Sequence, residues 1–240
     1  MRAAIVTGVS YGLGEAIAAQ LLAKGYRVLG VSRGASKRLK GEQYRYVSCD
    51  LGDAERIEAK LAEPMRELAA AKPSAVVLIN NAATAEPTGV LGRLDSHQIA
   101  SSIALNLTAP LILSNLFARI FGGGKLERRI LNVSSGAAQS TLAGSSVYGV
   151  SKAGLEMLSR SQAAEGEAIS VISIRPGIID TPMQLAARSH TPEEFPSVGM
   201  FKEFHASGQL VPPDTVAAKI IAKLVEGPIK SGEMYRYQEL

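Results

Sequence analysis

Short apolar runs alternate along this chain with longer stretches in which apolar residues recur every three or four positions. The short runs predict buried strands, and the longer stretches predict amphipathic helices. Strands are expected at Ala3–Val6, Arg27–Ser32, Tyr44–Cys49, Ala75–Ile79, Arg129–Val133, Ile169–Ile174 and Met234–Tyr237. Helices are expected at Leu13–Lys24, Asp53–Ala71, 95–121, Val147–Gln162 and Pro213–Glu226. This order predicts a single doubly wound α/β domain with a mostly parallel seven-stranded sheet flanked by helices.

Two segments depart from the regular pattern. Pro110 falls inside the stretch expected to be helical at 95–121, so that helix should kink or divide there. The segment Ser189–Gly208 contains two prolines and two glycines and is expected to be irregular. Because long irregular segments in compact domains often cover binding sites, we expect a substrate lid at about 183–210. A loosely packed surface insertion is the alternative.

Composition narrows the functional classes. The formal net charge is +4 without a long Lys/Arg run, so no nucleic-acid partner is expected. No apolar run reaches the ~18 residues that suggest a membrane span, so no membrane partner is expected. Cys49 is the only cysteine, which excludes an intrachain disulfide and fits a cytoplasmic location. The three histidines are dispersed, and no metal site is expected.

A glycine-rich turn, Thr7–Gly14, joins the first expected strand to the first expected helix. Gly8, Gly12 and Gly14 permit backbone angles closed to other residues and let the backbone approach a pyrophosphate closely. The N-terminus of the following helix offers oriented N–H groups to the same anion. The spacing is G-x-x-x-G-x-G rather than the usual dinucleotide fingerprint. Its position at the first strand–helix junction favours a dinucleotide site over a merely tightly packed turn.

The second expected strand ends in Ser32, and Arg33 follows it. In NAD-preferring folds an acidic residue near this point binds the adenosine ribose, and a carboxylate would repel a 2′-phosphate. Arg33 would bind that phosphate through charge-assisted hydrogen bonds, with Lys37 and Arg38 adding general attraction. We therefore expect NADP(H) as the cofactor. The alternative is that Arg33 is simply exposed on a loop.

Tyr148 and Lys152 are four residues apart in an expected helix and should share one face. Free tyrosine titrates near pH ~10, and a nearby ammonium favours the phenolate, so Lys152 should lower the pKa of Tyr148. Tyr148 would then donate a proton to a carbonyl oxygen, or remove one from an alcohol. Ser135, just after the fifth expected strand, would hold the reacting oxygen. Each residue alone is unspecific, but their combination with the glycine-rich turn is not.

Taken together, these motifs resemble the short-chain dehydrogenase/reductase family over nearly the whole chain. The resemblance implies one Rossmann-type domain over 1–240, with Asn106, Ser135, Tyr148 and Lys152 as catalytic residues. At the fourth expected strand, Asn80-Asn81-Ala82 matches the family motif, and Ala83 replaces its usual glycine.

The resemblance also assigns residues to NADP(H). Asp50 and Leu51 would lie beside the adenine, Lys152 would bind the nicotinamide ribose, and Asn106 would support a proton-relay water. The full implied set is Gly8, Ser10, Tyr11, Gly12, Leu13, Gly14, Arg33, Asp50, Leu51, Asn81, Ala82, Tyr148, Lys152, Pro176, Gly177, Ile179, Thr181 and Met183. Family members commonly pair through the helices expected at 95–121 and 147–162, so a homodimer or homotetramer is expected.

Within the family, the C-terminal part is most similar to sepiapterin reductases and bacterial benzil reductases. The similar stretches are Asp180–Gln184, Gly208–Val211 and Lys230–Gly232. Sepiapterin reductases anchor the pterin on an aspartate near the C-terminus. Arg236 falls at that position here, and Glu239 is three residues away. A diketone or other small hydrophobic carbonyl compound is therefore expected rather than a pterin.

The expected reaction is NADPH-dependent reduction of a small ketone or diketone to an alcohol by hydride transfer. Two alternatives use the same fold. One is an alcohol dehydrogenase that runs mainly in the oxidative direction with the same groups. The other is a non-catalytic NADP(H)-sensing regulator, a class that should lack the Tyr148/Lys152 pair present here.

Overall fold

The computed structural model describes residues 1–123, 125–166 and 168–240. Its strands are β1 (Arg2–Thr7), β2 (Arg27–Ser32), β3 (Tyr44–Ser48), β4 (Ala75–Asn80), β5 (Glu127–Val133), β6 (Ser170–Arg175) and β7 (Met234–Arg236). Its α-helices are α1 (Gly12–Ala23), α2 (Ala54–Ala70), α3 (Ser96–Ile103), α4 (Ala109–Phe121), α5 (Ser146–Ala164), α6 (Pro182–Ser189), α7 (Val198–Ala206) and α8 (Pro213–Ile220). Shorter helical turns are η1 (Ala104–Thr108), η2 (Gly136–Ala138), η3 (Ile221–Val225) and η4 (Tyr237–Glu239).

The strands form one seven-stranded sheet in the order β3-β2-β1-β4-β5-β6-β7, and each neighbouring pair is parallel. This confirms the predicted fold class. The central strands are apolar because both faces of the sheet are covered. The direction of strand addition reverses between β1 and β4. In sheets of this kind, ligands bind outside the carboxyl ends of the strands at that reversal.

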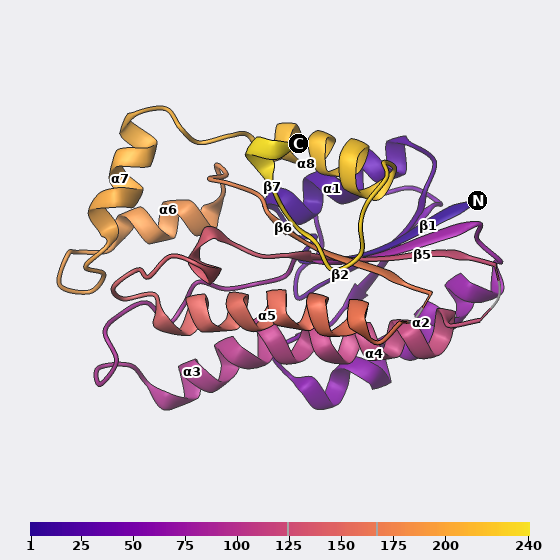
Figure 1. The fold of residues 1–240 in the computed structure, drawn as a ribbon, viewed down its shortest axis with the longest axis horizontal. Coiled ribbons are helices and arrows are strands. Elements are labelled where there is room, and N and C mark those ends of the chain that lie inside the picture. The colour runs from indigo at the N-terminus through magenta and orange to yellow at the C-terminus, as the bar shows by residue number, and fades with distance from the viewer. Residues whose placement is uncertain (124, 167) are drawn as a thin grey trace.

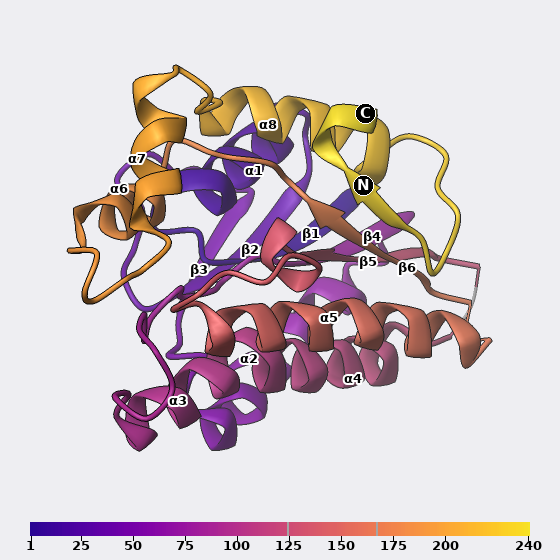
Figure 2. The ribbon, with the colours of Figure 1, turned by 60° about the vertical axis from the view of Figure 1, so that its left-hand side comes forward.

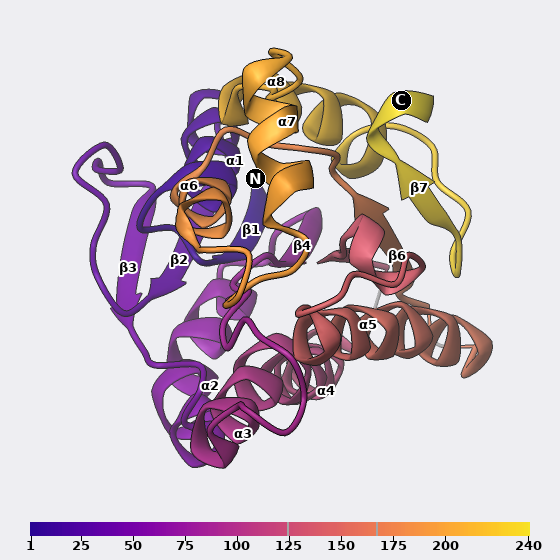
Figure 3. The ribbon, with the colours of Figure 1, turned by 90° about the vertical axis from the view of Figure 1, so that its left-hand side faces the viewer.

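Helices cover the sheet from both sides, as Figures 2 and 3 show. Helices α1 and α8 pack on one face, where Leu21 and Ile220 lie in the same apolar core. On the other face, the core contains Leu61 of α2 and Phe117 of α4. Helices α6 and α7 lie at one end of the molecule, beyond the main body of the sheet (Figure 1). The two faces are thus filled, and the carboxyl end is left for a site.

The long helical stretch containing Pro110 is interrupted just before the proline. The turn η1 is a π-helix in which the backbone N–H of Ala109 bonds to the carbonyl of Ala104. Pro110 has no N–H to offer the carbonyl of Asn106, so one α-helical hydrogen bond is lost in this turn. The predicted division of the helix is confirmed, and it places the buried Asn106 inside the widened turn.

The segment predicted to be irregular at Ser189–Gly208 is irregular over 190–197 and helical over about half of its length, so that prediction is only partly right. Helix α7 occupies Val198–Ala206, and α6 ends at Ser189. The two prolines of the segment lie between these helices, where they need not donate a backbone hydrogen bond. Pro182 at the start of α6 likewise occupies a position where a missing N–H costs nothing.

The stretch Ser96–Phe121 is more apolar than expected from the sequence. It is 26 residues long, and an 18-residue window within it has a mean hydropathy of 1.5, so it is long and apolar enough to cross a membrane by length and composition alone. The same composition is typical of a core helix, and Leu113 and Phe117 of α4 are fully buried against the sheet and α2. Packing in the fold thus accounts for much of this apolar character.

Candidate active site

A cavity of about 880 Å³ opens at the carboxyl end of the sheet. Its walls come from the turns after β1, β2, β4, β5 and β6 and from the segment that carries α6 and α7. The sequence-predicted site residues that line it are Gly8, Ser10, Tyr11, Gly12, Leu13, Arg33, Asp50, Leu51, Asn81, Ala82, Ser135, Tyr148, Lys152, Pro176, Gly177, Ile179, Thr181 and Met183. Gly14 and Asn106 do not line it.

The glycine-rich turn forms an open backbone cradle at the N-terminus of α1. Gly8 and Gly12 have φ of +73° and +68°, angles that L side chains rarely adopt. A Cβ on Gly14 would lie 2.3 Å from the Gly8 carbonyl oxygen and 2.4 Å from Asn81 Nδ2. Gly14 therefore lets the turn pack closely, without facing the cavity. No side chain caps α1, so its first N–H groups remain free to bind an anion.

The end of β4 is tied to this cradle through Thr7 and Asn81. Thr7 Oγ1 accepts a hydrogen bond from the Asn81 backbone N–H at 2.9 Å, and Asn81 Nδ2 donates to the Thr7 carbonyl at 2.9 Å. These bonds hold the two strand ends in fixed register across the reversal in strand order. The pyrophosphate cradle and the centre of the cavity are thereby parts of one rigid unit.

Arg33 is exposed on the cavity wall. Ser10 and Ser32 both donate through their hydroxyls to the Gly34 carbonyl at 2.8 Å, which folds this turn against the glycine-rich loop. Among the described residues, the Arg33 side chain makes no hydrogen bond or ion pair, so its guanidinium is free for a ligand. Arg38, by contrast, is bound by Asp214 through two hydrogen bonds of 3.1 and 2.9 Å. This pair engages the Arg38 guanidinium, and the expected contribution of Arg38 to phosphate attraction stays a prediction.

Tyr148 and Lys152 lie one turn apart on α5, and Ser135 follows β5 at the start of the turn η2. The Ser135 hydroxyl accepts a hydrogen bond from the Ala137 N–H at 3.2 Å. Lys152 Nζ donates to the Val133 carbonyl at 2.7 Å and lies 5.7 Å from the centre of the Tyr148 ring. The strand end and the helix thus bring the three predicted side chains to one wall of the cavity.

The expectation that Lys152 lowers the pKa of Tyr148 is wrong. Loss of hydration raises the pKa of the Tyr148 phenol above its ordinary value, although a hydrogen bond with Ser135 acts in the opposite direction. Burial also lowers the pKa of Lys152 to about 8. The Lys152 ammonium donates to the Val133 carbonyl. Loss of hydration is the main cause of the pKa shift of both Tyr148 and Lys152. The phenol is therefore held protonated, the form that can donate.

Asn106 is buried in η1 and is fully used by the protein. Its Oδ1 accepts from the Thr84 N–H at 2.9 Å, and its Nδ2 donates to the Thr84 carbonyl at 2.8 Å and to Ser151 Oγ at 3.1 Å. Ser151 Oγ in turn donates to the Tyr148 carbonyl at 2.7 Å. The Asn106 side chain therefore ties the loop after β4 to the first turn of α5. It does not reach the cavity.

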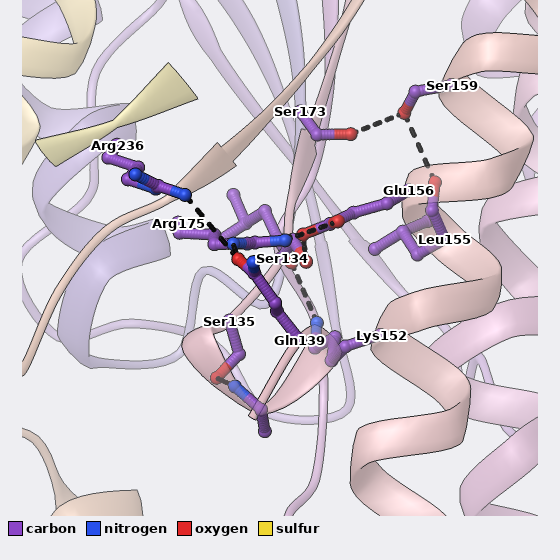
Figure 4. Close-up of polar contacts among 12 residues, drawn as sticks. Ser134, Ser135, Gln139, Lys152, Leu155, Glu156, Ser159, Ser173, Arg175 and Arg236 are labelled. Atoms are coloured by element: carbon purple, nitrogen blue, oxygen red, sulfur yellow. Dashed lines mark hydrogen bonds and ion pairs between the residues drawn. The ribbon is translucent and has the colours of Figure 1, made fainter. Parts of the chain in front are cut away.

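A polar cluster beside the catalytic wall was missed from the sequence (Figure 4). Glu156 on α5 binds Arg175, the last residue of β6, through two hydrogen bonds of 2.8 Å. Its Oε1 also accepts from Ser134 Oγ at 2.7 Å, and Arg175 contacts Gln139. The one available signal was that Glu156 lies four residues after Lys152, on the same helix face.

The opposite wall of the cavity is apolar. Helices α6 and α7 and the loop between them contribute Met183, Ala187, Phe195, Met200, Phe201 and Phe204. Phe195 packs closely on Gly144, where a Cβ would lie 2.9 Å from the ring. The predicted lid segment thus lines the cavity, with helical rather than irregular structure.

Comparison with known proteins agrees with this geometry. The family model for short chain dehydrogenases matches residues 2–192. A benzil reductase ((S)-benzoin forming) of Bacillus cereus is 33% identical over 249 residues, covering 100% of both chains. The sepiapterin reductase of Meriones unguiculatus is 32% identical, covering 95% of this chain and 93% of that protein. The crystal structure of the KRED1-Pglu enzyme superposes with a TM-score of 0.85 at 28% identity, covering 98% and 100%. The chain therefore belongs to the short-chain dehydrogenase/reductase family of nicotinamide-dependent oxidoreductases.

Proposed function

We propose that this protein reduces a small, hydrophobic ketone or diketone to an alcohol with NADPH, and that Tyr148 is the proton donor. The observation that carries the proposal is a single cavity joining the glycine-rich cradle to Ser135, Tyr148 and Lys152. The benzil reductase relative supports a diketone, because its name states that reaction for that protein.

In this mechanism, Ser135 donates a hydrogen bond to the carbonyl oxygen and fixes its position. Tyr148 transfers its phenolic proton to that oxygen as the C–O double bond becomes single. When bound, the reduced nicotinamide supplies the hydride to the carbonyl carbon, and the oxidised cofactor and an alcohol result. Lys152 binds the cofactor ribose.

The cofactor would lie along the turns at the strand ends. Gly8, Gly12 and the N-terminus of α1 would hold the pyrophosphate. Those residues of the predicted cofactor set that lie between Asp50 and Met183 would contact the adenine or the nicotinamide half of the cofactor. Gly14 would act by close packing. Asn106 would act by positioning the first turn of α5.

Arg33 is proposed to select NADPH through the 2′-phosphate. Its guanidinium lines the cavity without a partner among the described residues. We expect Arg33→Asp to lower kcat/KM for NADPH and to shift the NADPH/NADH preference by about 10- to 100-fold, because a charged hydrogen bond is replaced by repulsion. Steady-state rates with both cofactors measure this. Arg38→Asp is the matched control, and an unchanged ratio in Arg33→Asp would remove Arg33 from this role.

The assignment is tested with a panel of ketones, diketones and sepiapterin, followed by NADPH absorbance and product analysis. We expect diketones to give alcohols with one NADPH oxidised per carbonyl reduced. Faster turnover with NADP and alcohols would favour the oxidative alternative. NADPH binding without oxidation across the whole panel would instead favour a sensor.

We also propose that the protein forms a homodimer or homotetramer. Its proposed location is the cytoplasm. Apolar side chains are exposed on the helices through which the family commonly pairs: Leu111 of α4 is 46% exposed, and Val150 and Met157 of α5 are 64% and 54% exposed. Light scattering measures the mass in solution. A monomer at micromolar concentration would contradict this part of the proposal.

A further inference from the structure

One rim of the cavity is polar, in contrast to its apolar lid wall. Gln139, Arg175, Arg236 and Gln238 line this rim, which lies beside Ser135 (Figure 4). The carboxylates near it are already engaged: Glu156 binds Arg175, and the Glu239 carboxylate accepts hydrogen bonds from the backbone N–H and the guanidinium of Arg236. The rim therefore has donors to spare and few free acceptors.

The anchor of the rim is the ion pair between Arg175 and Glu156. Their side chains are only 12% and 13% exposed, and the contact is bidentate. Glu156 is further fixed by Ser134 Oγ at 2.7 Å. A bidentate guanidinium–carboxylate pair has one geometry, so the remaining Arg175 nitrogen has a set direction. That nitrogen, Nη1, contacts Gln139.

Two guanidinium groups determine how the Gln139 amide is oriented. Arg175 Nη1 and Arg236 Nη2 both approach Gln139 Oε1, the latter at 3.5 Å. Guanidinium nitrogens are donors only, so the amide oxygen must face them and the NH₂ group must face away. Among the described residues, that NH₂ group makes no hydrogen bond. Arg236 has only long contacts, at 3.4 Å to Glu239 and 3.5 Å to Gln139, and keeps further N–H groups free.

We propose that Gln139 and Arg236 form a subsite for a hydrogen-bond-accepting oxygen of the substrate, separate from the carbonyl that is reduced. This inference rests on the proposed function and specifies its substrate class. The class is a ketone with a second acceptor oxygen, either another carbonyl or a carboxylate. Ser135 and Tyr148 take one oxygen, and the rim takes the other.

The subsite also has the wrong polarity for a pterin. The 2-amino group and N3–H of a pterin are donors, and an aspartate suits them. Arg236 stands at the position where the resemblance places that aspartate, and the Gln139 NH₂ group adds a second donor. Donors that face donors leave polar groups of the ligand unpaired, which disfavours its binding.

The test compares 1-phenyl-1,2-propanedione, which has a second carbonyl, with propiophenone, which lacks it. The diketone is the more reactive compound, so the quantity of interest is how each substitution changes the ratio of their kcat/KM values. Gln139→Glu keeps the size and both guanidinium contacts but removes the NH₂ donor. We expect Gln139→Glu and Arg236→Met each to lower the diketone/monoketone ratio about tenfold or more, through KM of the diketone. The matched control is Arg160→Met, which removes an exposed arginine of α5 that does not line the cavity.

A third substrate, benzoylformate, distinguishes the source of the acceptor oxygen. If the rim is built for a carboxylate, Arg236→Met should impair benzoylformate more than the diketone. Equal losses would indicate a neutral carbonyl, and both results support the subsite. Ratios that stay unchanged in Gln139→Glu and Arg236→Met, while the wild type reduces these substrates, would overturn this inference alone. A wild type that reduces none of the three compounds would overturn the proposed function and the inference with it.

Discussion

The two long walls of the cavity are built in opposite ways. The catalytic wall, formed by α5 and the ends of β5 and β6, is held by largely buried polar contacts, such as Lys152 to the Val133 carbonyl and Glu156 to Arg175. The lid wall, formed by α6 and α7, is held by a small apolar cluster in which Phe195 and Val198 are buried. The catalytic wall depends on directional hydrogen bonds and ion pairs, whereas the lid wall depends on buried apolar surface.

This difference suggests a division of labour. Hydrogen bonds and ion pairs fix orientation, which proton transfer requires. Apolar contacts are non-directional and tolerate substrates of different shape. Damage to the catalytic wall should therefore affect turnover and stability, whereas damage to the lid should affect which substrates bind.

The largest effect is expected from Tyr148→Phe. Removal of the proposed general acid should lower kcat by about 10²- to 10⁴-fold. Cofactor affinity, measured by titration calorimetry, should hardly change, because the ring remains. Tyr26→Phe is the matched control, since Tyr26 lies outside the catalytic cavity. Retained turnover in Tyr148→Phe would show that the catalytic wall does not carry the chemistry.

Glu156→Ala should be the next largest change, and it acts on folding. Burial alone would raise the pKa of Glu156, but hydrogen bonds from Arg175 and Ser134 hold that pKa below its ordinary value. Removal of one partner of a largely buried pair typically costs about 3–5 kcal/mol of unfolding free energy, measured here by urea denaturation. Because the folded-state pKa is depressed, this stabilisation is present above the ordinary glutamate pKa and is lost as pH falls through the folded value.

Glu58→Ala provides the comparison for Glu156→Ala. Glu58 pairs with Arg119 on the surface, with both side chains 51% exposed. Exposed pairs contribute about 0–1 kcal/mol. Equal losses in the two variants would mean that the catalytic wall is held no more firmly than the surface.

Lys152→Met tests the wall through its pH dependence. Burial lowers the pKa of Lys152 from 10.5 to about 8, so the unfolded chain binds more protons than the folded chain between these values. Folding stability should therefore rise with pH across this window in the wild type, by up to roughly 3 kcal/mol relative to Lys152→Met. Urea denaturation of both proteins at pH 7, 8, 9 and 10 gives the difference. Parallel curves would contradict a buried, desolvated lysine.

The smallest effect is expected in the lid. Phe204 lines the cavity but is not part of the buried lid cluster. Phe204→Ala should raise KM for bulky apolar ketones about tenfold and leave kcat for small ketones near the wild-type value, because only a hydrophobic contact is lost. Leu185→Ala, on the outward side of α6 and 52% exposed, is the control. A large fall in kcat for small ketones would show that the lid is also part of the catalytic machinery.

The difference between the catalytic wall and the lid wall also determines which features could be predicted from the sequence. Residues of the catalytic wall are close together in the chain or lie at strand ends, so Tyr148, Lys152 and Ser135 could be placed from spacing and from the order of strands and helices. All seven strands were predictable: β1, β2, β4, β5 and β6 are short, mostly buried runs, and β3 and β7 are short runs at the two edges of the sheet. These features depend on residues that are neighbours in the chain, so they can be predicted without knowledge of the tertiary contacts.

Contacts between distant segments could not be predicted. Arg38 meets Asp214 across 176 residues, and Arg175 meets Glu156 across 19 residues and two elements. The helices of the lid were missed because prolines and glycines suggested an irregular segment, whereas the prolines lie between the helices. The pKa of Tyr148 was misjudged because desolvation depends on the whole fold and cannot be read from the spacing of Tyr148 and Lys152.

The division of labour is tested most directly by single-turnover NADPH oxidation with one small and one bulky ketone, in the wild type, Tyr148→Phe and Phe204→Ala. Tyr148→Phe should slow both ketones by the same large factor. Phe204→Ala should change the ratio between the ketones and leave the small one near its wild-type rate. The account is contradicted if Tyr148→Phe turns over at the wild-type rate, or if the two variants change the ratio alike.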